Sequence, residues 1–191
     1  MLDTIMSQGL ALVMGITLAA ICGLRAFLPL LVISILSAFG KIELGEAFQW
    51  MSSWPAITTF SVAVVLEIAA DKLPVVDHVL DTAGLVIKPI AASVAMAGMI
   101  KEFDPLLALV LSLVTGGLLA EGLHILKAKL RLLSSAATGT IANPILSFFE
   151  DFIAISGALV AWLLPAVGFV YLCVFVFIIY RIRRRRAQAS G

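Results

Sequence analysis

The stretch Glu67–Asp81, EIAADKLPVVDHVLD, carries the side chains best suited to chemistry in this chain. It places four acids, a lysine and a histidine between two apolar runs. Carboxylates and imidazole can exchange protons, pair with cations or bind Mg²⁺ or Mn²⁺. Because charges are costly among apolar residues, we expect these side chains either to pair or to line a polar cavity.

The donor set for a metal would be Glu67, Asp71, Asp77, His78 and Asp81. Their spacing matches no established metal motif, so the sequence leaves a metal site open. It contains no glycine-rich phosphate loop, no cysteine pair spaced for zinc and no nucleophilic serine elbow. We therefore assign no catalytic residue and expect no cofactor, and an enzyme is the less favoured class.

Composition points to a lipid environment. The 191 residues are 62% hydrophobic and 13% charged, against about 25% charged in soluble domains. The mean hydropathy is +1.13. We expect a single transmembrane domain over residues 1–180. The arginine-rich segment 181–191 is expected to be a cytoplasmic tail beside anionic lipid, without binding nucleic acid.

The apolar runs predict about six membrane spans. Residues 5–39 are apolar except for Arg25 and would make a helix of about 50 Å, too long for a hydrocarbon core of about 30 Å. This run is therefore either one helix broken near residues 23–29 or two short passes. The further spans are expected at residues 55–72, 83–100, 105–131, 132–149 and 151–180. The fifth is rich in small and polar residues and either crosses as a broken helix or re-enters.

Several residues have the character of helix N-caps. Ser53 and Asp104 each precede a proline near the start of an apolar run. Asp81 or Thr82 is expected to cap the third span. Ser147 to Glu150 has the spacing of a capping box before the last span.

Two segments echo each other. Pro74 is followed seven residues later by Asp81, and Pro144 is followed seven residues later by Asp151. We interpret residues 5–100 and 105–180 as inverted repeats, a plan typical of secondary transporters. The predicted fold is an all-α, polytopic membrane helix bundle. It has about six spans as two inverted three-helix repeats, with broken helices at residues 23–29 and 139–147.

Basic residues orient this arrangement. With the tail in the cytoplasm, Lys127 to Arg131 also lie inside, and Lys41 and Lys101 lie outside. Both termini are then cytoplasmic, unless the first run is split and the N-terminus lies outside. Glu67 and Asp71 fall near the inner side, where we expect them to face His124 and Lys127. Glu150 and Asp151 fall near the outer side and are expected to face Arg25.

The candidate substrate path gathers the charged and polar side chains expected inside the bundle. Glu121, His124, Lys127 and Arg131 share roughly one helix face. The path or binding residues are predicted to be Arg25, Glu67, Asp71, Lys72, Asp77, His78, Asp81, Glu121, His124, Lys127, Asn143, Glu150 and Asp151.

Several of these motifs resemble a known family. They are Gly23-Leu24-Arg25-Ala26, the Asp-Lys-x-Pro-x-x-Asp-His stretch from Asp71, His124 with Lys127 and Arg131, and Asn143-Pro144 with Ser147 and Glu150-Asp151. The chain resembles, over almost its whole length, small bacterial integral-membrane proteins grouped only as a domain of unknown function. The resemblance implies a bacterial inner-membrane protein and supplies no activity.

Three functions follow as hypotheses. The first is a small inner-membrane transporter or channel-like protein that moves a small polar or charged solute through paired polar half-sites. The second is a membrane enzyme that acts on lipid headgroups. The third is a scaffold whose charges only pair helices. The expected partners are the lipid bilayer, a small solute or lipid headgroup, and a second copy in a homodimer.

Overall fold

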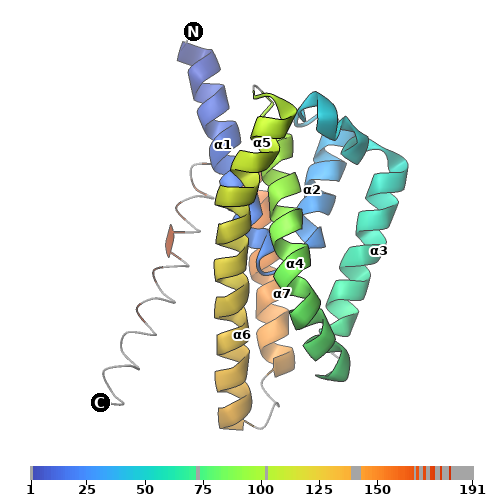
Figure 1. Ribbon diagram of the computed structural model, residues 1–191, viewed down its shortest axis with the longest axis vertical. Coiled ribbons are helices and arrows are strands. Elements are labelled where there is room, and N and C mark those ends of the chain that lie inside the picture. Colours follow the sequence, from blue (N-terminus) through green and yellow to red (C-terminus); the bar gives the residue numbers. More distant parts are fainter. Residues whose placement is uncertain are drawn as a thin grey trace.

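The computed structural model is all-helical over the residues that it describes (Figure 1). These are residues 2–71, 74–101, 103–138 and 143–165, with 167, 170, 173, 174, 177 and 181 beyond them. The helices are α1 (Leu2–Cys22), α2 (Phe27–Ala38), the 3₁₀ helix η1 (Glu46–Ser52), α3 (Trp54–Ala70), α4 (Pro74–Met99), α5 (Pro105–Ser112), the π-helical segment η2 (Leu113–Gly117), α6 (Leu118–Thr138) and α7 (Asn143–Leu163). The predicted all-α class is confirmed.

The first apolar run is split into two helices. Helix α1 runs into the middle of the molecule, and α2 returns to the end from which α1 came (Figure 1). The predicted break is confirmed at residues 23–26, and Pro29 lies inside α2. Helix α2 ends where Gly40 adopts a positive φ of 65° and its amide donates to the Ser37 carbonyl. The pair therefore forms a helical hairpin whose tip carries Arg25.

Helix α3 begins as the sequence predicts. The Ser53 side chain accepts a hydrogen bond from the Ala56 amide at 3.4 Å, and Pro55 occupies the first turn. The 3₁₀ helix η1 meets α3 at an angle of 67°. Asp71 directly follows the last residue of α3. The helix therefore carries Glu67 and Asp71 at its far end, as expected.

Helix α4 starts earlier than predicted. It begins at Pro74, so Asp81 and Thr82 lie inside the helix and the predicted cap there is wrong. Proline is readily accommodated in a first helical turn because the amide that it lacks would have no partner there. Pro89 also lies inside α4.

The next helical run begins with a confirmed cap. Oδ1 of Asp104 accepts hydrogen bonds from the Leu106 and Leu107 amides at 3.0 and 3.2 Å. The helix passes through the π-helical segment η2 and continues as α6 to Thr138, beyond the predicted end at residue 131. Such π-helical turns are frequent at functional sites.

The predicted fifth span differs from the structure. Residues 132–138 continue α6 and residues 143–149 begin α7, while residues 139–142 lie outside the described part. The predicted break at residues 139–147 is thus wrong for residues 143–147, which are helical. Ser147 is inside α7, so the capping box expected there is also wrong. The sequence analysis missed that Asn143 and Pro144 begin helix α7.

Small residues let the central helices approach closely. Helix α1 packs against α4, α6 and α7, while α3 stands at one edge against α2 and, less extensively, α4 (Figure 1). A Cβ on Gly116 would lie 3.0 Å from the Ala19 Cβ and 3.2 Å from the Met96 sulfur. The core therefore depends on small residues at these crossings, as is common between membrane helices.

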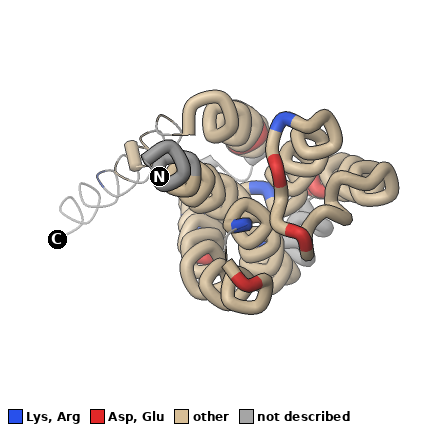
Figure 2. Tube along the Cα trace, turned by 90° about the horizontal axis from the view of Figure 1, so that it is seen from above, with Lys and Arg blue, Asp and Glu red and all other residues tan. Residues whose placement is uncertain are grey.

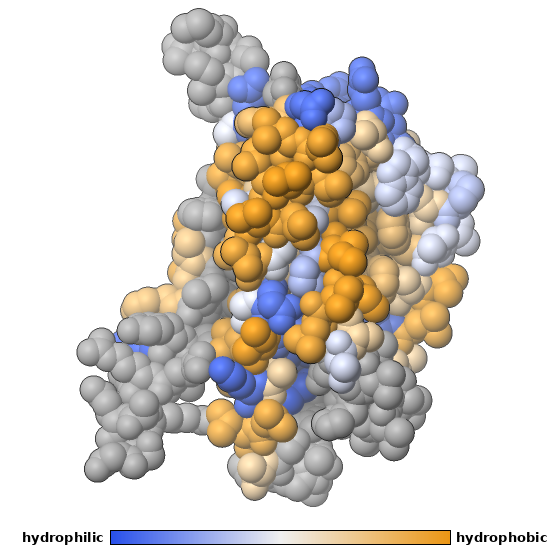
Figure 3. Space-filling model, in the orientation of Figure 1, coloured by the Kyte–Doolittle hydropathy of each residue, from blue (hydrophilic) through white to orange (hydrophobic). Residues whose placement is uncertain are grey.

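The surface and helix lengths are those of a membrane protein. Three segments are long and apolar enough to cross a membrane, namely Thr82–Met99, Pro105–Ser134 and Ile145–Leu163, and a fourth if η1 and α3 form one bent span. The six predicted spans are not confirmed. Hydrophobic side chains cover much of the visible face, and hydrophilic side chains gather at the end near η1 (Figure 3). A second hydrophilic group interrupts the hydrophobic surface farther from that end (Figure 3).

Candidate functional site: a buried charge cluster

The site is built around the break between α1 and α2. An added Cβ on Gly23 would overlap the Ala120 carbonyl, so glycine allows the end of α1 to lie against α6. The break interrupts helical hydrogen bonding, and Lys127 Nζ lies 3.4 Å from the Leu24 carbonyl oxygen. Irregular backbone at membrane depth requires such partners from the surrounding protein.

Glu67 caps the N-terminus of α2 from another helix. Its Oε1 accepts from the Ala26 amide at 2.8 Å, and its Oε2 accepts from the Phe27 amide at 3.3 Å. The first amides of a helix carry partial positive charge and have no partner within the helix. A carboxylate on α3 therefore satisfies the start of α2, a role that sequence reasoning missed because the two residues are far apart in the chain.

Arg25 lies at the tip of the hairpin and is 1% exposed. Its Nη1 lies 2.5 Å from Asp71 Oδ2, and its Nη2 lies 2.5 Å from Asp151 Oδ1. Nη2 also donates to the Ser147 hydroxyl at 3.1 Å. One guanidinium thus joins the end of α3 to the first turns of α7.

Helix α6 supplies two more cations. Lys127 Nζ lies 3.0 Å from Glu150 Oε2 and 3.5 Å from Asp71 Oδ2. Arg131 Nη2 lies 3.0 Å from each of the same two oxygens. We call Arg25, Asp71, Lys127, Arg131, Glu150 and Asp151 the charge cluster. Asp71 is its centre, since one oxygen faces three cations.

A second polar contact lies beside the cluster. Lys88 Nζ on α4 is 2.7 Å from His124 Nδ1 on α6, and both side chains are buried. A Cβ on Gly84 would lie 3.1 Å from His124 Cε1 and 3.3 Å from Lys88 Cε. Glycine therefore leaves room for this pair. The sequence analysis did not assign Lys88 to the site.

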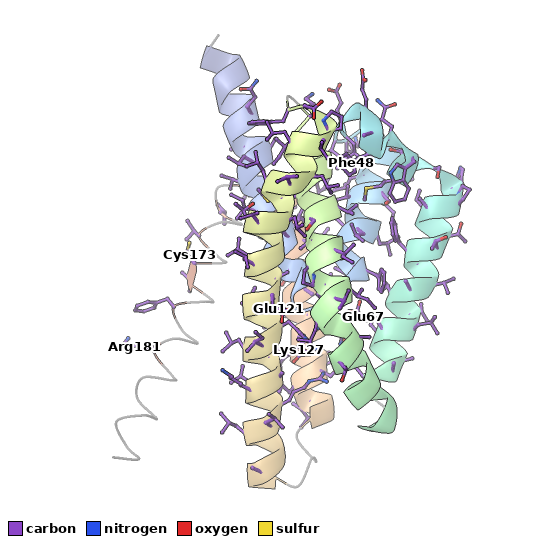
Figure 4. The ribbon with its side chains drawn as sticks, viewed as in Figure 1. Phe48, Glu67, Glu121, Lys127, Cys173 and Arg181 are labelled. Atoms are coloured by element: carbon purple, nitrogen blue, oxygen red, sulfur yellow. The ribbon has the colours of Figure 1, made fainter. Side chains whose placement is uncertain are left out.

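The charged positions lie among the helices as well as around the rim of the molecule (Figure 2). Glu67, Glu121 and Lys127 are at similar heights, well away from Phe48 at the end near η1 (Figure 4). Glu121 is half-buried on α6, one turn before His124.

Two of the predicted pairings are confirmed, and the predicted separation of the acids into an inner and an outer site is wrong. Glu67 does not face His124 or Lys127, because its carboxylate accepts the Ala26 and Phe27 amides. Asp71 does face Lys127, and Asp151 does face Arg25. Glu150 meets Lys127 instead, and Arg25 also meets Asp71, so the two expected sites on opposite sides form one cluster. The reason is the hairpin, because it holds Arg25 inside the bundle.

The remaining predicted path residues lie partly or wholly outside the described part of the chain. Lys72 lies outside the described residues, as do the side chains of Asp77, His78, Asp81 and Asn143. Among the residues whose side chains are described, no three His, Cys, Asp or Glu residues are arranged to hold a metal ion. Ser147, expected to form a capping box, instead donates to Asp71 Oδ2 at 3.4 Å.

A cavity of about 450 Å³ reaches the cluster from the side. We call it the α3–α4 cavity. It is lined by Ala26, Phe27, Ala63, Leu66, Glu67, Ala70, Asp71, Gly84, Ile87, Lys88 and Lys127. Its volume falls within the range of about 300–1,000 Å³ that is usual for small-molecule sites.

These features define a helical membrane protein with a helical hairpin between α1 and α2 and a buried network of charges. Residues 12–185 match the family described as Domain of unknown function (DUF4126), and the chain belongs to that family. No curated protein and no solved structure matches it.

Proposed function

We propose that this protein is a small transporter or channel-like protein that moves a small polar or charged solute past the charge cluster. The observation that carries the proposal is the α3–α4 cavity, because Glu67, Asp71, Lys88 and Lys127 all line it. Charges buried in a membrane protein usually face a polar pathway or cavity. A charge cluster that only held helices together would not need a cavity leading to it.

The energetics of burial support a functional role. A buried ion pair costs several kcal/mol of desolvation per ion, and apolar residues of similar volume often stabilise a protein as well or better. Asp71 and Lys127 side chains are only 5% and 3% exposed. Buried charges therefore stabilise the helix packing less well than apolar residues would. They can, however, exchange ion-pair partners with a charged solute.

The mechanism follows from the shared contacts of Asp71. Its Oδ2 atom faces Arg25, Arg131 and Lys127 at 2.5, 3.0 and 3.5 Å. A solute charge can replace one partner while the other two keep the carboxylate neutralised. Exchange of partners would let the hairpin tip move relative to α6 and α7, which is the alternating-access step of this proposal.

The two-repeat interpretation finds support in reciprocal pairing. Arg25 in residues 5–100 meets Asp151 in residues 105–180, and Lys127 of the second segment meets Asp71 of the first. Inverted repeats commonly form their site where the halves meet near the membrane midplane. The two polar half-sites are then parts of a single centre.

The orientation belongs to the proposal too. Placing the basic end of α6 in a bacterial cytoplasm leaves Lys41 and Lys101 outside, in line with the charge bias expected of an inner-membrane protein. The start of α1 lies at the same end as these two lysines, because α1 and α2 form a hairpin (Figure 1). In this proposed orientation the N-terminus lies outside, which is the alternative that the sequence analysis gave for a split first run. A homodimer remains part of the proposal.

The alternative is a scaffold, and one observation favours it. The charge cluster pairs three cations with three carboxylates, so its formal charges balance. In that case the cluster would only fix the hairpin against α3, α6 and α7.

Reconstituted liposomes discriminate between the two functions. Purified full-length protein should conduct at least one of three probe classes, namely inorganic cations, small anions or fluorescent lipids. Arg25→Ala and Asp71→Ala should abolish that flux, whereas Lys101→Gln, which removes an exposed ion pair, should not. Because the first two variants can fail to fold, the replacement of Lys127 and Glu150 by Met and Leu is tested alongside them.

This double replacement removes one cation and one acid together and so preserves charge balance. The scaffold predicts that it keeps wild-type stability and any cellular phenotype, since apolar residues can replace an ion pair. The transport proposal predicts a stable protein without flux. Absence of flux for all three probe classes in the wild-type protein would refute the transport proposal.

A further inference from the structure

A second and larger cavity lies between the first half of α1, the end of α4 and α5, at the end of the bundle near η1 (Figure 1). We call it the α1–α5 cavity, and Gly9, Met14, Met96, Met99 and Leu111 are among its lining residues. Its volume is about 870 Å³, within the range of about 300–1,000 Å³ that is usual for small-molecule sites. No residue of the charge cluster lines it, so the proposed transport path does not account for it.

The rim of this cavity lies where a membrane surface is expected. Lys41, Glu43 and Lys101 line the cavity from the loop after α2 and from the residue that follows the end of α4. Hydrophilic side chains gather at this end of the molecule (Figure 3). Trp50 and Trp54, in η1 and at the start of α3, are exposed there, and tryptophan is enriched at membrane–water interfaces. A ligand of this cavity would therefore have its head group at the membrane surface.

The deeper wall of the cavity suits a flexible apolar chain. Met14, Met96 and Met99 are buried and belong to α1 and α4. Methionine side chains are flexible and polarizable, so they adapt to apolar partners of irregular shape. The Thr115 hydroxyl also lines the cavity, but it already donates to the Leu111 carbonyl at 2.7 Å. A hydrocarbon chain matches this wall better than a polar solute does.

The rim supplies a cation that is available to a ligand. Among the residues that the structure describes, no hydrogen bond or ion pair involves the Lys41 side chain, which is exposed. Lys101 pairs with Glu43 at 2.5 Å, so the charges of these two residues cancel. The formal charge of the three rim residues is therefore +1 and comes from Lys41. An ammonium group forms strong, charge-assisted hydrogen bonds with phosphate oxygens, which favours a head group with one negative charge.

We propose that the α1–α5 cavity binds an anionic phospholipid of the surrounding bilayer, with its phosphate at Lys41 and one acyl chain against Met14, Met96 and Met99. The site shares no residue with the charge cluster, so its occupancy does not depend on transport.

Photolabelling measures this occupancy directly. Full-length protein in phosphatidylcholine nanodiscs receives a phospholipid that carries a diazirine in one acyl chain and has either a phosphatidylglycerol or a phosphatidylcholine head group. Labelled residues are mapped by mass spectrometry. Leu118 and Leu119 on α6 are exposed and do not line the cavity, so their labelling reports general lipid contact. Relative to that reference, we expect the phosphatidylglycerol probe to label residues 9–14 and 96–101 about fivefold more than the phosphatidylcholine probe, the ratio expected from one lysine near a membrane surface.

Two pairs of matched variants identify the cavity. Gly9 and Gly122 are exposed helical glycines at which an added Cβ would have no atom within 4 Å, but only Gly9 lines the cavity. Gly9→Phe adds a ring at the cavity wall and should lower labelling there by both probes, whereas Gly122→Phe should not. Lys41→Gln removes the rim charge and should abolish the fivefold preference for phosphatidylglycerol. Lys129→Gln removes an exposed charge of α6 and should retain that preference.

Three results would overturn the inference. One is equal labelling of the cavity by the two probes, because Lys41 would then select no head group. Another is unchanged labelling in Gly9→Phe and Lys41→Gln, because the labelled lipid would then lie outside the cavity. The third is labelling of Leu118 and Leu119 without labelling of the cavity, because a different occupant, such as a second copy of the chain, would then cover it. Liposome flux tests transport alone: a protein without flux can retain the lipid site, and a protein with flux can lack it.

Discussion

Replacing Asp71 by asparagine keeps the shape of the side chain and removes the central charge of the cluster. Arg25, Lys127 and Arg131 would then share two carboxylates, Glu150 and Asp151. One cation is left in excess in a buried site. Loss of one partner from a buried pair costs about 3–5 kcal/mol, most of it from the uncompensated charge, and we expect this loss in the free energy of unfolding.

The geometry also predicts which second change rescues the first. Lys127→Met removes the excess cation while keeping a side chain of similar length. Arg25 then retains Asp151 at 2.5 Å, and Arg131 retains Glu150 at 3.0 Å. Two complete pairs remain, so we expect the double variant to be more stable than Asp71→Asn and to recover most of the loss.

Unfolding in mixed detergent micelles, followed by circular dichroism, measures these differences. Glu43→Gln is the matched control, because it removes one partner of an ion pair with Lys101 that is exposed. Its effect should be small, as for most surface ion pairs. The reasoning is refuted if Asp71→Asn is no more destabilising than the control, or if the losses from Asp71→Asn and Lys127→Met simply add.

Three further predictions concern single contacts. Gly23→Ala should destabilise the fold because its Cβ would overlap the α6 backbone, whereas Gly122→Ala, with no atom within 4 Å, should be neutral or slightly stabilising in the same unfolding assay. Asp104→Ala should cost about 1 kcal/mol through loss of the α5 cap. The hydrogen bond and charge of Lys101 hold the pKa of the Glu43 carboxyl below its usual 4.5. This contribution is present above pH 4.5 and disappears as the pH falls through the lowered pKa, so Lys101→Gln should lose slightly less stability on acidification than wild type.

The sequence predicted those helix boundaries that depend only on neighbouring residues. Ser53 and Asp104 are caps because each has a short oxygen-bearing side chain before a proline and an apolar run. The α1–α2 break was visible because the apolar run is too long for one span. The starts of α4 and α7 were missed. Asp81 and Ser147 have the local character of caps, yet proline-led turns begin both helices earlier.

The sequence by itself determined that the chain is a helical membrane protein and that its acids pair with cations from distant segments. Both follow from composition, because a lipid environment penalises isolated charges and unpaired backbone. Only the tertiary structure decided where those pairs meet. The α1–α2 hairpin holds Arg25 within ion-pair distance of both Asp71 and Asp151. Lys127 pairs with Asp71 and Glu150. Which charged side chains meet depends on how the helices pack against one another. The local sequence of Glu67–Asp81 does not encode that packing.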